Sequence, residues 1–342
     1  RIRDLWKHEI IRKNPALTED SISDPIVVPG LSAGIWLTAD MFINPGDTVI
    51  FPDMYWDNYP LIMEERKGAS VVTFPFYTSS GGFNVARFAE TVRSCEKTKK
   101  VVILLNFPNN PTGYSPTTAE VQAIAAEIKK CAEEGYKILV ISDDAYFGLF
   151  FEPETYKSSL FNLLAGIHKN VCAVKVDGST KEDFVWGFRC AFITFGSAGM
   201  SKAQYDALVT KMMGAVRSSV SSSSMPAQSI LFRAFQNPNF QSEKAHYTEL
   251  VKRRYEAVKR VLKNRTAGKA LKELPFNSGY FMTFACTGIS AETLRKELLK
   301  VGVGTISIGD AYLRIAFASV DEDGIEELYR LIFETADRLQ KA

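Results

Sequence analysis

The feature that most constrains the fold of this 342-residue chain is a series of short apolar runs, rich in β-branched residues and separated by helical patterns. Runs of this kind suit strands that are buried on both faces of a sheet. Their alternation with helices predicts right-handed crossovers and a mostly parallel sheet with helices on both sides. The strands are expected at residues 47–52, 70–76, 101–108, 136–145 and 171–176, and the clearest helices at 32–43 and 117–134.

The length of the chain favours two domains, because a single hydrophobic core rarely grows to this size. After about Gly196 the pattern changes to long helices and a few short strands, which predicts a second, smaller α+β domain. Near this change lies the serine-rich segment 217–228. It is either a flexible linker or a packed loop whose hydroxyl and amide groups face a ligand.

Composition excludes several classes of function. The formal net charge of +2 is spread along the chain, which argues against nucleic-acid and membrane partners, and no apolar run approaches the length of a membrane-spanning helix. The five cysteines form no C-x-x-C pair, which predicts a reduced, cytoplasmic protein. The three histidines have no partner at metal-ligand spacing, so neither a metal site nor a histidine-centred triad is expected.

Polar motifs follow successive predicted strands. In a parallel sheet of this kind, ligands bind beyond the carboxyl ends of the strands. Each motif alone has an ordinary interpretation as a turn, a helix cap or a solvated charge. Their occurrence together, in this order, indicates a site. The motifs are N-N-P-T-G at 109–113, D-D-A-Y at 143–146 and D-G-S-T-K at 177–181, preceded by P-G-L-S-A-G-I at 29–35, which opens a helix whose N-terminus suits a phosphate.

With these motifs the sequence resembles the fold-type I, pyridoxal-5′-phosphate-dependent aminotransferases of class I/II. The most specific elements are N-P-T-G at 110–113, D-x-A-Y at 143–146, and Lys181 followed eight positions later by Arg189. The resemblance implies a three-layer α-β-α large domain with a mostly parallel sheet at residues 26–233. It also implies a small α+β domain at 234–342, to which residues 1–25 contribute. It further implies a homodimer with sites at its interface.

The resemblance also assigns roles to residues. Lys181 would carry pyridoxal 5′-phosphate as a Schiff base and move protons, and Asp143 would keep the ring nitrogen protonated. Tyr146 and Asn110 would contact the phenolic oxygen of the ring, and Trp56, with Tyr55 as its competitor, would stack on the ring. Asp144 is expected to be a solvated or capping carboxylate. The expected cofactor contacts are Leu31, Ser32, Ala33, Trp56, Asn110, Asp143, Tyr146, Ser179, Lys181 and Arg189.

Two further arginines concern the substrate. Arg314 lies inside an apolar run, where a charge is costly unless it is paired, and the family uses this position to bind the substrate α-carboxylate. Arg217, eleven residues before Gln228, has a spacing similar to that in aspartate aminotransferases, where an arginine of the neighbouring subunit binds a side-chain carboxylate. A surface arginine is the other interpretation. The substrates expected for the site are an L-amino acid and a 2-oxo acid, with Asn110, Arg314 and Arg217 as their contacts.

The sequence departs from the family pattern in two places. Gly178 stands where the family often has a serine that touches the phosphate, and Ser179 or Thr180 is expected to replace it. The family's N-terminal arm is expected to lie outside this sequence, which begins at Arg1. Two alternative functions remain on the same scaffold: a β-lyase that cleaves a C–S bond, and a regulatory domain that binds the cofactor without turnover.

Overall fold

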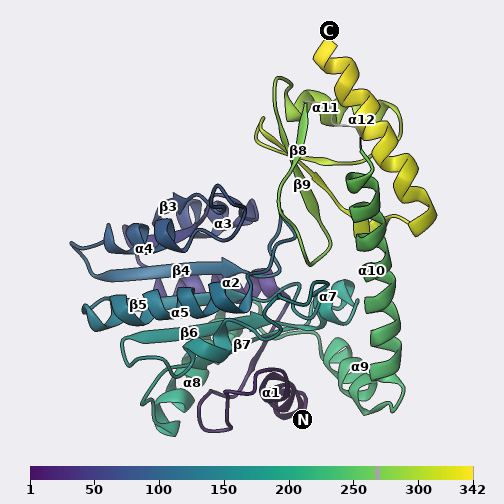
Figure 1. The fold of residues 1–342 in the computed structure, drawn as a ribbon. Helices are drawn as coiled ribbons and strands as arrows, with labels where there is room; N and C mark the ends of the chain where they lie inside the picture. Colours follow the sequence, from purple (N-terminus) through teal and green to yellow (C-terminus); the bar gives the residue numbers. More distant parts are fainter. Residues whose placement is uncertain (266–269, 342) are drawn as a thin grey trace. The chain divides into compact units, whose positions relative to one another are not determined.

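The computed structural model describes residues 1–265 and 270–341, and the chain forms two compact units (Figure 1). Unit 1 comprises Arg1–Pro108, Pro116–Gly148 and Glu154–Phe240. Unit 2 comprises Asn109–Ser115, Leu149–Pro153 and Gln241–Ala342. No helix in the described part of the chain is both long and apolar enough to cross a membrane.

Unit 1 is built on a seven-stranded sheet with the order β1-β7-β6-β5-β4-β2-β3. The strands from β6 to β3 are parallel, whereas β7 runs antiparallel to both of its neighbours. The bounds are β1 Ile26–Val28, β2 Thr48–Pro52, β3 Ser70–Phe74, β4 Lys100–Asn106, β5 Lys137–Asp143, β6 Val171–Asp177 and β7 Ala191–Gly196.

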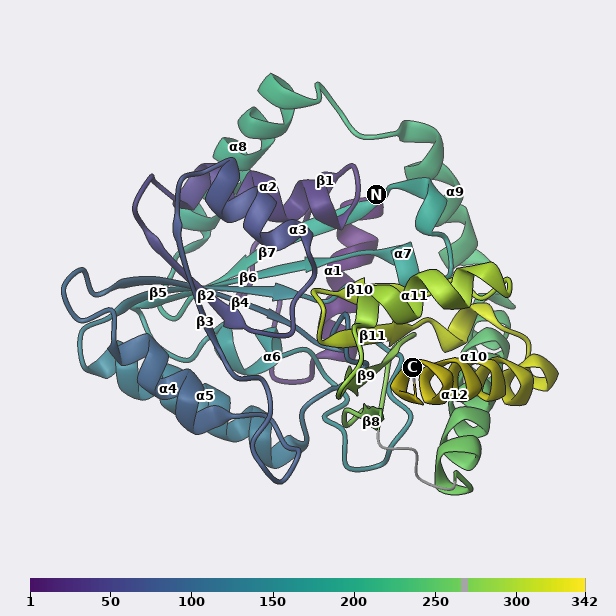
Figure 2. The same ribbon diagram turned by 90° about the horizontal axis from the view of Figure 1, so that it is seen from above.

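Helices cover both faces of this sheet, as expected for strands that are buried on both sides (Figure 2). On one face lie α2 (Leu31–Phe42) and α8 (Lys202–Ser219), and on the other α4 (Val85–Arg93) and α5 (Thr118–Glu133). The remaining helices of unit 1 are α1 Ile2–Lys13, α3 Asn58–Pro60, η1 Leu61–Glu65, α6 Phe161–Leu164, α7 Ser179–Glu182, η2 Trp186–Phe188 and α9 Met225–Gln236.

The five strands expected from the sequence are present as β2 to β6, with ends that differ by up to two residues. The capping box of α5 is also present: Thr117 accepts from the Glu120 N–H, and the Glu120 side chain accepts from Thr117. The serine-rich segment 217–228 is not a linker between the two units, because it lies within unit 1. It contains the end of α8, a short turn and the start of α9, which is capped by Ser224.

Residues 1–25, which were expected to join the small domain, belong to unit 1 in this structure. The reason is the packing of α1. Trp6 is fully buried, and its ring stacks on Phe192 of β7 at a centroid distance of 4.4 Å.

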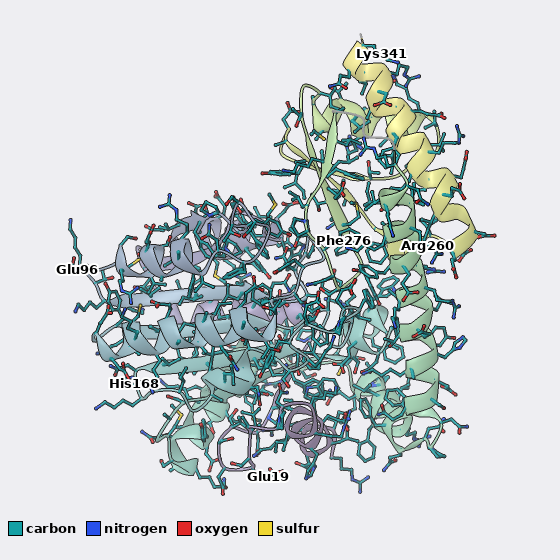
Figure 3. The ribbon with its side chains drawn as sticks, in the orientation of Figure 1. Glu19, Glu96, His168, Arg260, Phe276 and Lys341 are labelled. Carbon is teal, nitrogen blue, oxygen red and sulfur yellow. The ribbon has the colours of Figure 1, made fainter. Side chains whose placement is uncertain are left out.

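The two ends of the parallel strands differ in chemistry. Glu96 and His168, labelled in Figure 3, precede β4 and β6 and mark the amino ends of the strands. Asp143 and Asp177 stand at the opposite, carboxyl ends of β5 and β6, and both are buried. The polar motifs of the sequence therefore follow the end of the sheet where ligands bind in this architecture.

Unit 2 contains a four-stranded antiparallel sheet with the order β10-β11-β9-β8. Its core includes Phe284 of β9, whose ring packs edge-on against Tyr329 at 6.2 Å. The elements are α10 Phe240–Lys263, β8 Leu271–Glu273, β9 Met282–Cys286, α11 Ala291–Lys300, β10 Ile306–Ile308, β11 Tyr312–Ile315, η3 Phe317–Ser319, η4 Glu322–Gly324 and α12 Ile325–Lys341.

Candidate active site

The carboxyl ends of β5 and β6 bring two of the sequence motifs together. Asp143, the last residue of β5, pairs in register with Val176 of β6. The Asp144 N–H then donates to the Val176 carbonyl at 2.9 Å. Directly after β6 comes α7, the short helix that carries Lys181, beyond the end of the strand in Figure 2. The D-x-A-Y motif and the lysine turn therefore start from neighbouring points of the sheet.

Asp143 is a buried carboxylate with a specific donor. The Tyr59 hydroxyl donates to Oδ2 at 2.5 Å, and the Ala145 N–H donates to Oδ1 at 3.1 Å. Burial raises the pKa of Asp143 to about 6, and these two hydrogen bonds oppose the rise. Burial and the charge of Asp143 raise the pKa of Tyr59, so its hydroxyl keeps the proton that it donates.

Trp56 and Tyr55, the two candidates for the stacking ring, have different neighbours. The Trp56 ring lies edge-on to Tyr59 at 5.7 Å, next to the residue that holds Asp143. The Tyr55 ring instead packs against Phe51 of β2 at 4.8 Å. The contact with Tyr59 favours Trp56 for the position nearer the carboxylate.

Lys181 is half-buried within α7, and Tyr146 is its aromatic neighbour. The Lys181 Nζ atom lies 5.8 Å from the centre of the Tyr146 ring, and Tyr146 itself is buried. Because Tyr146 follows Asp143 by three residues, the lysine amine, the tyrosine ring and the buried carboxylate belong to one continuous part of unit 1.

Gly30 and Arg189 lie together at the N-terminus of α2. Gly30 is the N-cap residue of α2, at φ +94°, and provides no side-chain cap for the first turn. A Cβ at Gly30 would lie 2.2 Å from Nη2 of Arg189, so a side chain at this position would displace the guanidinium, and the positive φ also favours glycine. The exposed Arg189 side chain thus lies at the positive end of a twelve-residue helix. Leu31, Ser32 and Ala33 form the first turn of that helix, with Leu31 and Ala33 buried and Ser32 half-buried.

Ser179 and Thr180 carry hydroxyls that suit an additional acceptor. Both residues are buried, and neither Ser179 Oγ nor Thr180 Oγ1 has a hydrogen-bond partner among the residues that the structure describes. Buried hydroxyls are rarely left in this state without a ligand or water. The departure at Gly178 also has a steric cause, because a Cβ there would lie 2.7 Å from the Cys190 carbonyl oxygen.

These residues fit pyridoxal 5′-phosphate. A helix N-terminus, a guanidinium and two hydroxyls without protein partners suit its phosphate, and a buried carboxylate suits its ring nitrogen. Lysine is the side chain that binds an aldehyde covalently through its amine.

Asn110 and Arg314 belong to unit 2, where they contact each other. The Arg314 Nη1 group donates to Asn110 Oδ1 at 2.7 Å, and the guanidinium lies 4.3 Å from the centre of the Phe281 ring. Arg314 is half-buried on β11, where its guanidinium contacts an amide oxygen and an aromatic ring.

Arg217 lies in a different group of residues within unit 1. It is exposed on α8, and its Nη1 group donates to Ser221 Oγ at 2.5 Å. Together with Arg3 and Gln228 it lines a cavity of about 480 Å³. The Arg217–Gln228 spacing therefore does place two polar side chains on one surface feature.

A buried ion-pair cluster at the carboxyl ends of β5 and β6 was not predicted from the sequence. Asp144, expected to be solvated or capping, is 5% exposed and forms an ion pair with Lys175 of β6. Lys175 Nζ also lies 3.3 Å from Asp177 Oδ2, and Ser159 Oγ donates to Asp144 at 2.6 Å. The rule applied to Arg314, that a charge inside an apolar strand must have a partner, would have found Lys175. Tyr59 was also missed, because 84 residues separate it from Asp143.

Comparison with known proteins identifies the family of this chain. The chain matches the family model of the class I and II aminotransferases over residues 2–332. An aspartate aminotransferase of Sulfurisphaera tokodaii is 25% identical over 354 residues, which cover 97% of this chain and 78% of that protein. An aspartate aminotransferase of Musicola paradisiaca is 34% identical over 121 residues, which cover 35% of this chain and only 28% of that protein.

Solved structures show the same fold. An aminotransferase of Anaerococcus prevotii matches with a TM-score of 0.84 at 25% identity, and the match covers 98% of this chain and 80% of that chain. The kynurenine aminotransferase of Pyrococcus horikoshii matches with a TM-score of 0.83 at 18% identity, and the match covers 100% of this chain and 81% of that chain.

The chain therefore belongs to the class I and II aminotransferases. Members of this family are transaminases that use pyridoxal 5′-phosphate. The family and the fold type indicated by the strand-end motifs are thus confirmed.

Proposed function

We propose that this chain transfers an amino group between an L-amino acid and a 2-oxo acid, with Lys181 as the residue that binds the cofactor covalently. The observation that carries the assignment is the pairing of β5 with β6. This pairing sets the buried Asp143 next to the strand that leads directly into the Lys181 turn. When bound, pyridoxal 5′-phosphate supplies an electron sink for the bond to the substrate Cα.

In this proposal each residue acts through an ordinary physical property. Asp143 stabilises a positive charge on the ring nitrogen, and Tyr59 keeps its carboxylate oriented and ionised. The Lys181 amine moves a proton at the substrate Cα, and Trp56 covers one face of the ring. Tyr146 and Asn110 donate to the phenolic oxygen of the ring. Contacts to the cofactor phosphate come from the first turn of α2 (Leu31, Ser32 and Ala33), Ser179, Thr180 and Arg189.

Substrate binding is assigned to unit 2 and to the α8 surface. Arg314 presents a planar guanidinium that suits the α-carboxylate shared by all amino acids. Arg217 is proposed to bind a side-chain carboxylate. The support for this last assignment is its place beside Gln228 in the cavity on α8.

We also propose that the chain forms a homodimer in the cytoplasm and serves a biosynthetic process. The exposed side chains of Met213, Val220, Met225 and Ile230 on and around α8 and α9 support a protein interface. The five cysteines are all free, which supports a reducing compartment.

The test is an absorption spectrum of the protein with pyridoxal phosphate, followed by titration with amino acids. The proposal requires a visible band that amino acids remove and 2-oxo acids restore. Lys181→Ala should abolish the band, whereas Lys157→Ala, a lysine outside the proposed site, should leave it unchanged. A band in Lys181→Ala equal to that of the wild type would refute the assignment. If sulfur amino acids release pyruvate and 2-oxo acids do not restore the visible band, the chain is a β-lyase. If no substrate changes the band, the chain is a regulatory domain.

A further inference from the structure

Helix α1 contacts the segment that carries Lys181 at both ends of that segment. The Trp6 Nε1–H group donates to Asp177 Oδ1 at 2.9 Å, four residues before Lys181. Lys13, the last residue of α1, places Nζ 2.5 Å from Oε1 of Glu182, the residue that directly follows Lys181. A helix near the start of the chain thereby fixes a turn about 170 residues away.

The contact at Glu182 is buried. The Glu182 side chain is 4% exposed and that of Lys13 12%. A buried carboxylate is costly unless a cation balances it, and removing one partner of such a pair leaves an uncompensated charge. Other charged side chains also bear on this turn. Glu9 lies 3.8 Å from Lys13, and Arg12 and Lys175 both interact with Glu182. The buried carboxylates of Asp183, which directly follows Glu182, and Asp177, which pairs with Lys175, add negative charge.

We propose that Lys13 is a positioning residue for the cofactor lysine: through Glu182 it fixes the Lys181 turn and neutralises the carboxylate beside it. This inference depends on the proposed role of Lys181. Lys13 itself touches neither cofactor nor substrate in this proposal. Its effect reaches the Lys181 nitrogen through the neighbouring residue, by geometry and by charge.

A purely structural role for the ion pair makes a different prediction, and the same helix offers the control. Lys7 of α1 is 14% exposed and forms ion pairs with Asp24 at 3.1 Å and Glu19 at 3.4 Å. The exposure of Lys7 resembles that of Lys13, but its two partners are more than half exposed and lie outside the lysine turn. Lys7→Met therefore reports the loss of an α1 ion pair without a change of charge beside Lys181.

The experiment measures the pH midpoint of the visible band of the holoenzyme, which follows protonation at the Lys181 nitrogen. Lys13→Met leaves the Glu182 charge unbalanced, which favours the protonated form, so the midpoint should rise by about 0.5–1 pH unit. Glu182→Gln leaves the Lys13 charge unbalanced, so the midpoint should fall by a similar amount. The double variant and Lys13→Arg should remain near the wild type, and Lys7→Met should not shift the midpoint.

Opposite shifts in the two single variants establish the role, because a loosened turn would move both midpoints in the same direction. Equal shifts, or a Lys13→Met protein that behaves as Lys7→Met does, would overturn it. If Lys13→Met does not fold, the double variant is compared with Glu182→Gln: a midpoint that falls in Glu182→Gln and returns toward the wild type in the double variant supports the role, and equal midpoints in the two would overturn it. A visible band that survives Lys181→Ala would instead refute the proposed function, which separates the two failures.

Discussion

Replacing Tyr59 with phenylalanine tests how the structure controls the charge of Asp143. Burial raises the pKa of Asp143 to about 6, and the Tyr59 hydroxyl at 2.5 Å opposes that rise. A hydrogen bond to a charged group contributes about 1.5–3 kcal/mol, and one pKa unit corresponds to about 1.4 kcal/mol. Tyr59→Phe should therefore raise the pKa of Asp143 in the cofactor-free protein by about one to two units, to roughly 7–8.

This change has a defined effect on stability. The folded protein binds the Asp143 proton more tightly than the unfolded chain, whose ordinary pKa is 3.8. The contribution of Asp143 to the free energy of unfolding therefore falls as the pH rises from about 4 to 6 and is constant above that range. In Tyr59→Phe the fall continues to a pH of about 7–8. The difference between the two proteins should thus widen between pH 6 and 8 by about 1.5–3 kcal/mol.

The assay is urea unfolding of the cofactor-free proteins at several pH values from 5 to 8.5. Tyr329→Phe is the matched control, because the buried Tyr329 hydroxyl has no hydrogen-bond partner in the described part of the chain. Its difference from the wild type should not depend on pH over this range. If the Tyr59→Phe difference were equally flat between pH 6 and 8, the hydrogen bond would not control the charge of Asp143.

Three further substitutions give distinct outcomes. Gly178→Ser, which restores the common family residue, should destabilise the protein by about 1–3 kcal/mol in urea unfolding, because its Cβ would meet the Cys190 carbonyl oxygen at 2.7 Å. Lys175→Met should lower the free energy of unfolding by about 3–5 kcal/mol at pH 7, because it leaves Asp144 and Asp177 without their buried cation. The loss should be smaller at pH 5, and an equal loss at both pH values would contradict this cause. Arg314→Gln should raise the KM for every amino acid by roughly 30–150-fold while the affinity for pyridoxal phosphate stays constant, because the lost interaction is a charge-assisted one of about 2–3 kcal/mol.

The parallel strands of unit 1 were predictable because strands that are buried on both faces have continuous apolar sequences. Strand β1 was missed since three residues, Ile26–Val28, give too short a pattern. Strand β7 was missed although Ala191–Gly196 is apolar, because only the short helices α7 and η2 separate it from β6 and no long helical pattern marks a crossover between them. Alternation of strands and helices predicts crossovers, and an antiparallel neighbour needs none.

The residues of the site divide in the same way. Lys181, Asp143 and Arg189 could be predicted from the sequence because they stand in local motifs that resemble those of the family. Tyr59 lies 84 residues before Asp143, and Lys13 lies 169 residues before Glu182, so no local pattern joins either pair. Such contacts follow only from the three-dimensional packing of the helices.

The single domain boundary predicted near residue 234 differs from the observed chain path, because two earlier segments also belong to unit 2. Asn109–Ser115, which follows β4, is part of unit 2. There the Gly113 carbonyl accepts from the N–H groups of Asn277 and Ser278, both at 2.9 Å. Thr283 Oγ1 also donates to the Pro111 carbonyl at 2.8 Å, across 172 residues of sequence.

A ribosome releases these partners at very different times. The segment 109–115 emerges early and must wait for residues 277–283 before its carbonyl groups find their donors. A C-terminal fragment that begins at Gln241 would lack that segment altogether and leave the same donors unpaired. The smaller unit is therefore assembled last and from both halves of the chain, so it cannot be obtained by cutting the gene at one point.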